Sequence, residues 1–275
     1  MAITTIDGAL AGMKPPFFFA KAVSPTLTVG MPFSFWLSAG APSSGILSTA
    51  LGGTALTSTA TQRQGQIYHS NPVSGNAYLS RLSCAASQAG VLILADRLLD
   101  VGVTSTGPML LTAAAASSML STGILARDAN GSSAGVGVQL GYEVTTILSG
   151  GGGSLSASYT NSTGTAAHTA VTTSTIAAAA PVGSFFFASL AAGDIGVQSV
   201  QTVTPSTGFT SGFVSAVLYR PLAIVELSAA GIPNAVDALT AGFPQMYNGS
   251  VPFFIFVPNA VTATTIVGSV VETQG

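Results

Sequence analysis

Two histidines and one cysteine are the residues of this 275-residue chain whose types most readily perform chemistry. Nucleophilic catalysis would need Cys84 beside His69 or His168, so that a ring nitrogen could take the proton from the thiol. Cys84 lies in a stretch of alternating apolar and polar residues, which is typical of a strand, and a small buried thiol behaves as a hydrophobic residue. Both histidines are interpreted as structural. The sequence therefore predicts no catalytic residue and a protein that is not an enzyme.

Metal and cofactor sites are not indicated either. A metal site usually needs three or four ligands, and no His-x-His, Cys-x-x-Cys or His-Glu-x-x-His spacing occurs. The glycine run at 150–153 lacks the Lys-Ser/Thr of a phosphate-binding loop. A carboxylate pair for glycoside hydrolysis would have to come from nine scattered acids whose spacing singles out no pair. One of them, Asp194, is interpreted as a turn residue. We expect no metal and no cofactor.

The charged residues cluster in two places, Asp96-Arg97 with Asp100, and Arg127-Asp128. In a chain with so few charges, each is expected to make a specific salt bridge or cap. Asp96 and Asp100 are four residues apart with Arg97 between them, a spacing that could brace a short helix. The alternative is that Arg97 or Arg127 contacts a neighbouring subunit.

The composition of the chain limits the kind of fold that can position these residues, because few residues are charged. Charged residues make up 6% of it, against roughly 25% in an ordinary domain. Hydrophobic residues make up 48% and the net charge is −2, which excludes intrinsic disorder and argues against nucleic-acid binding, since phosphates need clustered Lys and Arg. A surface of Ser, Thr, Gly, Asn and Gln suits a protein that is packed against copies of itself or a scaffold, because interface cores are depleted in charge.

The mean hydropathy of +0.59 does not by itself predict a membrane protein. The strongest apolar runs, at 90–95, 184–190 and 251–257, are shorter than the roughly 18 residues that a spanning helix needs. Residues 1–5 show no basic region leading into an apolar segment, which favours a product made in the cytoplasm. We expect no membrane partner.

The density of short strands and turns predicts an all-β fold, an antiparallel β-sandwich of jelly-roll or Greek-key type with an extended N-terminal arm. The sandwich is assigned to residues 63–228, and its best hairpin spans 154–175, where Leu, Ala and Tyr alternate with Ser. Residues 229–275 are predicted to form a C-terminal β unit that joins the sandwich, because two hairpins alone would be marginally stable.

Three local interpretations depend on weaker signals. Residues 91–94 form either a buried strand or the start of a short helix through Asp100. Residues 112–125 could be helical from their alanines, although flanking Gly and Pro leave this open. Residues 195–204 and 209–227 are expected to form a pair of strands around the turn at 205–208.

Residues 1–62 are predicted to be an extended Pro- and Phe-rich arm followed by a low-complexity linker, because proline blocks helix interiors and central strands. Aromatic residues exposed at this density would be a liability on a free monomer. The arm therefore either folds over its own core or reaches a neighbouring subunit. With the two arginines, the possible intersubunit contacts are Phe17, Phe18, Phe19, Phe33, Phe35, Trp36, Arg97 and Arg127.

Four segments resemble a family of virion structural proteins of tailed bacteriophages, of the capsid-associated or decoration type. They are 94–99, 156–166 (without 162–163), 190–200 and 217–222, and the third is the most specific. The resemblance covers about half of the chain. Tyr219 and Pro221 flank Arg220 where a more basic pair is usual in the family. The resemblance implies a phage structural protein and supplies no catalytic residue.

Together these features predict a virion protein, a capsid decoration, cement or minor capsid subunit that acts by protein–protein packing. Its expected partners are other virion subunits and further copies of itself, as a homo-oligomer. The alternative is a tail or fibre protein that recognises glycans on the host surface, for which clustered aromatic and acidic side chains in a shallow site would be expected.

Overall fold

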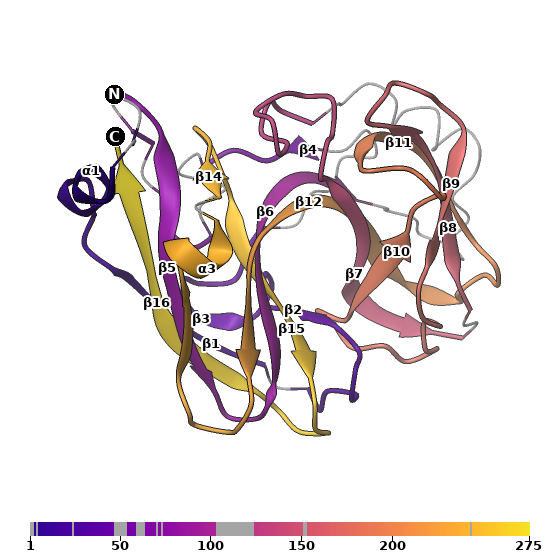
Figure 1. The fold of residues 1–275 in the computed structure, drawn as a ribbon. Helices are drawn as coiled ribbons and strands as arrows, with labels where there is room; N and C mark the ends of the chain where they lie inside the picture. The colour runs from indigo at the N-terminus through magenta and orange to yellow at the C-terminus, as the bar shows by residue number, and fades with distance from the viewer. Residues whose placement is uncertain are drawn as a thin grey trace. The chain divides into compact units, whose positions relative to one another are not determined.

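The computed structural model describes residues 3, 5–23, 25–46, 54–58, 64–69, 71–72, 74–102, 124–150, 153–242 and 244–275. These residues form antiparallel strands with two short helices (Figure 1), which confirms the predicted all-β class. The elements are α1 (Ile6–Ala11), β1 (Phe17–Ala22), β2 (Phe33–Ser34), β3 (Ala39–Ala41), β4 (Thr54–Ala55), β5 (Ala77–Ala86), β6 (Gly90–Gly102), β7 (Gln139–Ser149), β8 (Leu155–Asn161), β9 (His168–Thr172), β10 (Phe185–Ser189), β11 (Val197–Pro205), β12 (Ser211–Leu227), β13 (Asn234–Asp237), α3 (Ala238–Ala241), β14 (Gln245–Met246), β15 (Pro252–Pro258) and β16 (Thr265–Gln274).

The chain divides into two compact units. Unit 1 comprises Met1–Ile46, Thr57–Asp96 and Pro221–Gly275, and unit 2 comprises Leu47–Leu56 and Arg97–Arg220. Strands β6 and β12 each pass from one unit into the other. This division differs from the predicted boundaries at 62 and 228, because the two ends of the chain pair with the same set of strands.

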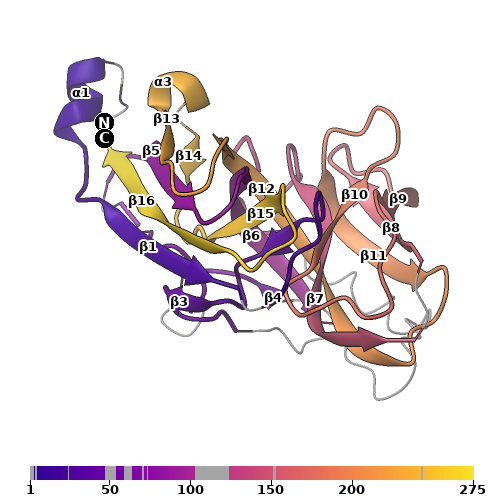
Figure 2. The ribbon, with the colours of Figure 1, turned by 90° about the horizontal axis from the view of Figure 1, so that it is seen from below.

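Unit 1 contains a six-stranded antiparallel sheet in the order β13-β5-β16-β1-β3, with β14 also paired to β5 (Figures 1 and 2). The C-terminal strand β16 is central, since Ile266 pairs with Ala86 of β5 and also with Lys21 of β1. A second layer includes β15, which pairs with β6 from Pro252–Asp96 to Pro258–Gly90. The C-terminal segment thus pairs with strands from the middle of the chain.

The core of unit 1 lies between these layers. On β5, Leu82 and Cys84 are buried and the residue between them is partly exposed, which is the period-two pattern of a sheet with one buried face. Leu79 is also buried, three positions before Leu82, because the pairing with β16 shifts register there. The rings of Phe19 and Phe254 meet across the core with centroids 4.4 Å apart.

The first 46 residues belong to this unit. Strand β1 is hydrogen-bonded on both edges, to β16 and to β3. Phe33 of β2 pairs opposite Phe256 of β15, and Phe35 and Trp36 are buried directly after it. Of the two interpretations of the N-terminal segment, the structure shows the first, because its aromatic side chains cover the core of the chain's own unit.

A buried lysine of β1 binds the residues on both sides of the neighbouring strand β3. Lys21 donates hydrogen bonds from Nζ to the carbonyl oxygens of Ser38, Pro42 and Ser43, at 2.8, 2.9 and 3.2 Å. Burial lowers the pKa of its ammonium group to about 8. Three acceptors match the three donors of the protonated amine, so Lys21 is a structural residue rather than a surface charge.

Unit 2 contains the strand order β11-β8-β9-β10-β7-β12. The predicted hairpin is confirmed as β8 and β9, with Tyr159 opposite His168. The predicted pairing of 195–204 with 209–227 is wrong: β11 pairs with β8, and β12 pairs with β7. Adjacency in sequence was the basis of that prediction, whereas each of these two strands pairs with a strand that lies much earlier in the chain.

One of the other two local predictions has a clear outcome. Residues 90–102 form strand β6 throughout, so the short helix through Asp100 is wrong. Leu92 and Leu94 are fully buried and alternate with partly exposed residues, which is the pattern of a strand. Most of the possible helix at 112–125 lies outside the described residues.

Candidate functional site: an uncharged surface

Most of the predicted intersubunit contacts point inward. Six of the eight residues are at most 4% exposed, so they cannot meet a neighbouring subunit as predicted. Phe18 is the exception, with 70% of its surface exposed, and Phe17 is half-buried and stacks on Tyr68 with ring centroids 5.8 Å apart. Burial inside the chain's own units explains why these residues are apolar or ion-paired. The six are Phe19, Phe33, Phe35, Trp36, Arg97 and Arg127.

Arg97 is the centre of a buried ion cluster in unit 2. Its guanidinium group holds Asp100 with two hydrogen bonds, Nη2–Oδ1 at 2.8 Å and Nε–Oδ2 at 3.2 Å. It also donates to Glu143 Oε2 on β7 at 2.5 Å. Burial opposes the charged form, but the two carboxylates outweigh it and raise the pKa of Arg97. The cluster ties β6 to β7 and leaves the arginine no part in an external contact.

The second predicted charge cluster is also internal. Arg127 donates from Nη2 to the carbonyl oxygens of Leu56 and Arg97, at 2.6 and 3.3 Å. Asp128 organises the loop that follows it. Burial opposes the ionised form, but hydrogen bonds from Ser132 and from nearby backbone N–H groups outweigh it and lower the pKa of Asp128. Arg127 and Asp128 therefore each have specific hydrogen-bond partners, as predicted, and these partners belong to the same chain.

The result is a unit whose surface carries almost no charge. Residues 47–56 and 97–220 contain seven charged side chains, and the parts of these ranges outside the described residues contain none. Six of the seven are buried, and Asp194 is half-buried. In the described part of unit 2, the exposed surface therefore consists mainly of hydroxyl, amide, glycine and apolar groups, with the partly exposed ring of His168. The apolar groups include Ile147 and Ile195, which are 59% and 61% exposed. The seven are Arg97, Asp100, Arg127, Asp128, Glu143, Asp194 and Arg220.

Unit 1 carries the exposed charges of the described residues. These are few, and they lie at the helices and strands of its six-stranded sheet and at the end of β12. The exterior therefore carries fewer charged side chains than the composition alone predicts, because more than half of the 16 charged residues are buried. The exposed ones are Asp7, Lys14, Arg81, Glu226 and Asp237.

A polar cluster that sequence reasoning missed lies where β8, β9 and the loop before β11 meet. Asp194 accepts hydrogen bonds from the Tyr159 hydroxyl and from Asn161 Nδ2, the latter at 2.8 Å, and its Oδ2 is 2.7 Å from Nδ1 of His168. The Ala191 N–H donates to the Tyr159 hydroxyl oxygen at 2.9 Å. Asp194 does lie beside a turn, as predicted, but its carboxylate also fastens that turn to the hairpin.

This cluster gives a prediction for the pH dependence of stability. The hydrogen bond from Tyr159, then that from Asn161, lowers the pKa of Asp194 below its ordinary value. A carboxyl group with a lowered pKa in the folded state stabilises the fold above its ordinary pKa of about 4 and loses that contribution as the pH falls. Asp194→Asn should therefore lower the urea midpoint at pH 7, and the difference from the parent should shrink toward pH 3. Equal differences at both pH values would contradict this, and Glu226→Gln, an exposed acid, is the matched control.

The other residues with chemical potential are engaged or buried. His69 Nδ1 is 2.9 Å from Glu272 Oε1, and its Nε2 is 3.1 Å from the carbonyl oxygen of Tyr247. Both ring nitrogens thus face acceptors inside unit 1. Burial raises the pKa of the Cys84 thiol to about 12, so that it stays protonated and is a poor nucleophile. Among the described residues, no group of three or more His, Cys, Asp and Glu is placed to hold a metal ion.

Across the described part of the chain, no helix has the length and apolarity that crossing a bilayer requires. No protein-family model matches the sequence, and no curated protein matches it either. Among solved structures, the chain aligns with the infectious bursal disease virus VP2 subviral particle at a TM-score of 0.16 and 9% identity, over 96% of this chain and 81% of that chain. A TM-score this low supports no argument about fold or function.

Proposed function

We propose that this protein is a structural subunit of a virus particle and works by packing against other protein subunits, without catalysis. The observation that carries the proposal is the inward orientation of the charges of unit 2. A free protein normally keeps its exterior charged for solubility, whereas the centre of a protein–protein interface is depleted in charge. A surface of hydroxyl, glycine and apolar groups has the composition that such an interface requires.

The four segments that resemble tailed-phage virion proteins support a structural role for a second reason. Each contains a residue that makes internal polar contacts or is buried as a charge: Arg97, Asn161, Asp194 and Arg220. The family-like residues thus hold the fold together. Within this class we assign a capsid decoration, cement or minor capsid subunit that lies in the virion beside other capsid subunits and further copies of itself.

A tail or fibre protein that binds host glycans has less support. Glycan sites combine exposed aromatic rings with nearby polar and acidic groups, and Trp36, the sole tryptophan, is in the core. Among the described residues, Phe18 and Tyr68 are the aromatic side chains with large exposed areas, and both are in unit 1.

The proposal predicts that this chain is present in many copies in purified particles and resists washing with salt. Ionic contacts between exposed charges weaken as salt screens them, but an interface without such charges does not depend on them. Quantitative mass spectrometry should give the same copy number for particles washed at about 0.1 and 1 M NaCl. Over that range the Debye length falls from about 10 to 3 Å, so an interface held by exposed charges would be weakened. Absence from particles would overturn the proposal. Release by 1 M NaCl would overturn its physical basis.

A further inference from the structure

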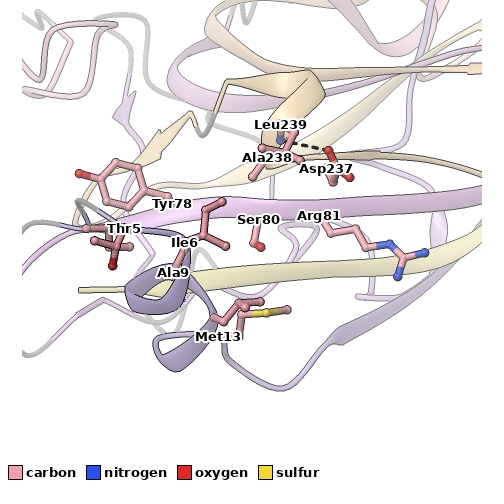
Figure 3. Close-up of a pocket in the computed structure, with 12 residues that line it drawn as sticks. Thr5, Ile6, Ala9, Met13, Tyr78, Ser80, Arg81, Asp237, Ala238 and Leu239 are labelled. Atoms are coloured by element: carbon pink, nitrogen blue, oxygen red, sulfur yellow. Dashed lines mark hydrogen bonds between the residues drawn. The ribbon is translucent and has the colours of Figure 1, made fainter.

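An apolar groove lies on the outer face of the six-stranded sheet of unit 1 (Figure 3). One wall is α1, the other is the start of α3, and the floor is the outward face of β5, with Tyr78, Ser80 and Arg81. The groove has a volume of about 550 Å³. The large apolar side chains at its walls are mostly exposed: Ile6 by 72%, Leu10 by 59% and Leu239 by 84%.

The wall formed by α1 is built without burial. Helix α1 has no buried residue, and Ile6 and Leu10, four positions apart, lie on the same side of it. Hydrogen bonds connect α1 and its C-cap to β16: Thr273 Oγ1 donates to the Ala9 carbonyl at 2.5 Å, and the Gln274 N–H donates to the Gly12 carbonyl at 2.9 Å. A six-residue helix is marginally stable in water on its own, because most helical stability comes from packing of an apolar face. Burial of the apolar side of α1 against a partner would supply that packing.

The charges beside the groove are of both signs. Arg81 of β5 and Asp237, the N-cap of α3, are both exposed and belong to neighbouring strands, with Asp237 paired opposite Arg81 in the sheet. The Asp237 side chain caps α3 through the N–H groups of Leu239 and Thr240, at 3.0 and 3.2 Å. The patch therefore combines a protruding leucine, an apolar groove, one cation and one anion.

We propose that this groove is the two-fold interface between two copies of this chain. A two-fold contact is self-complementary, so each feature of the patch must meet its complement on the same patch. In such a contact Leu239 would pack on α1 of the other copy. Arg81, which already faces Asp237 of its own chain, would also meet the partner's Asp237. A nucleic acid or strongly acidic partner would instead need an excess of positive charge, which this groove lacks.

This inference rests on the proposed function, because self-association is expected of a virion subunit and the groove is the surface that we assign to it. It differs from the uncharged surface of unit 2, which is assigned to contacts within the particle. The two assignments can therefore fail independently.

The test is the oligomeric state of the full chain, measured by sedimentation velocity between about 1 and 100 μM, the range in which associations of ordinary strength are populated. The parent chain is expected to be a dimer, and Leu239→Glu should weaken dimerisation by at least about tenfold, as for a central residue of an interface. Val261→Glu, at a position 65% exposed and outside the groove, is the matched control and should leave the dimer intact. A parent chain that is monomeric throughout, or a Leu239→Glu dimer as tight as the control, would overturn the inference.

Charge pairing and cross-linking provide the specific readouts. Asp237→Asn keeps a good N-cap and, like Arg81→Gln, should weaken the dimer, and the double variant should lose less than the sum of the two. Mixing Leu239→Cys with Leu10→Cys chains should give a disulfide-linked dimer faster than mixing Val261→Cys with Leu10→Cys. Additive losses or equal cross-linking rates would reject this geometry. If the chain dimerises through the groove but is absent from particles, the proposed function fails and this interface stands.

Discussion

Arg97→Met is expected to destabilise the fold by about 3–5 kcal/mol, the loss seen when one partner of a buried ion pair is removed. Asp100 and Glu143 have no exposed side-chain surface, and both are held by the Arg97 guanidinium. Without that cation, two carboxylates lie close together in a medium of low polarity. Urea unfolding at pH 7 measures the loss, and a decrease below about 1 kcal/mol, the size expected of an exposed pair, would contradict the assigned role.

A compensated variant separates charge from packing. Replacing Arg97, Asp100 and Glu143 together with Met, Leu and Met removes all three charges and keeps similar volumes. Because apolar replacements of buried ionic groups are often neutral or stabilising, this triple variant should recover most of the stability lost in Arg97→Met. If the triple variant is as unstable as the single one, the shape of the site rather than its electrostatics determines stability.

The fold class could be read from the sequence because it depends on local patterns. Alternation of Leu, Ala and Tyr with Ser identified β8, and the turn after it fixed the hairpin with β9, so that His168 came opposite Tyr159. The pairing of strands that are far apart in the sequence has no such local signal. The pairing of β11 with β8 instead of β12, and of β1 with β16, depends on side chains that fit together only after the chain has folded.

The candidate site was predicted less well than the fold, for a physical reason. Low charge content was read as a property of the surface, but the sequence does not say which charges are inside. A contact of Arg97 or Arg127 with a neighbouring subunit was the alternative to an internal salt bridge or cap, and the structure gives each of them buried acceptors. The predicted arm within residues 1–62 includes β1 and the buried Phe33, so its deletion would remove part of the core.

The cluster of Asp194 could in part have been found. Tyr159 and Asn161 are two residues apart on β8 and so share a face, and His168 lies on the other arm of the predicted hairpin, where the structure pairs it with Tyr159. The position of Asp194 could not be inferred, since it comes from a loop whose path depends on β10 and β11. The network joins the hairpin of β8 and β9 to the loop before β11.

The second large effect concerns assembly rather than stability. Ile147→Lys and Ile195→Lys introduce one charge each on the surface of unit 2, at positions that are 59% and 61% exposed. Exposed substitutions of this kind change stability by no more than about 0.5 kcal/mol, so the folded chain should be retained. If this surface is covered in the particle, an unpaired lysine in the interface would cost several kcal/mol, and incorporation of the double variant into particles should fall at least about tenfold.

The matched control places the same charges on unit 1, at Val261 and Ile232, which are 65% and 57% exposed and lie outside the groove. Val261→Lys with Ile232→Lys adds the same net charge, so it corrects for general effects on solubility and encounter. Particles assembled with the parent chain and each variant in competition, and compared by quantitative mass spectrometry, give the ratio directly. Exclusion of the unit 2 variant alone identifies the uncharged surface as the one that is covered. Equal incorporation of both variants would show that charge on unit 2 is tolerated, and then burial in an assembly cannot be the reason why its own charges face inward.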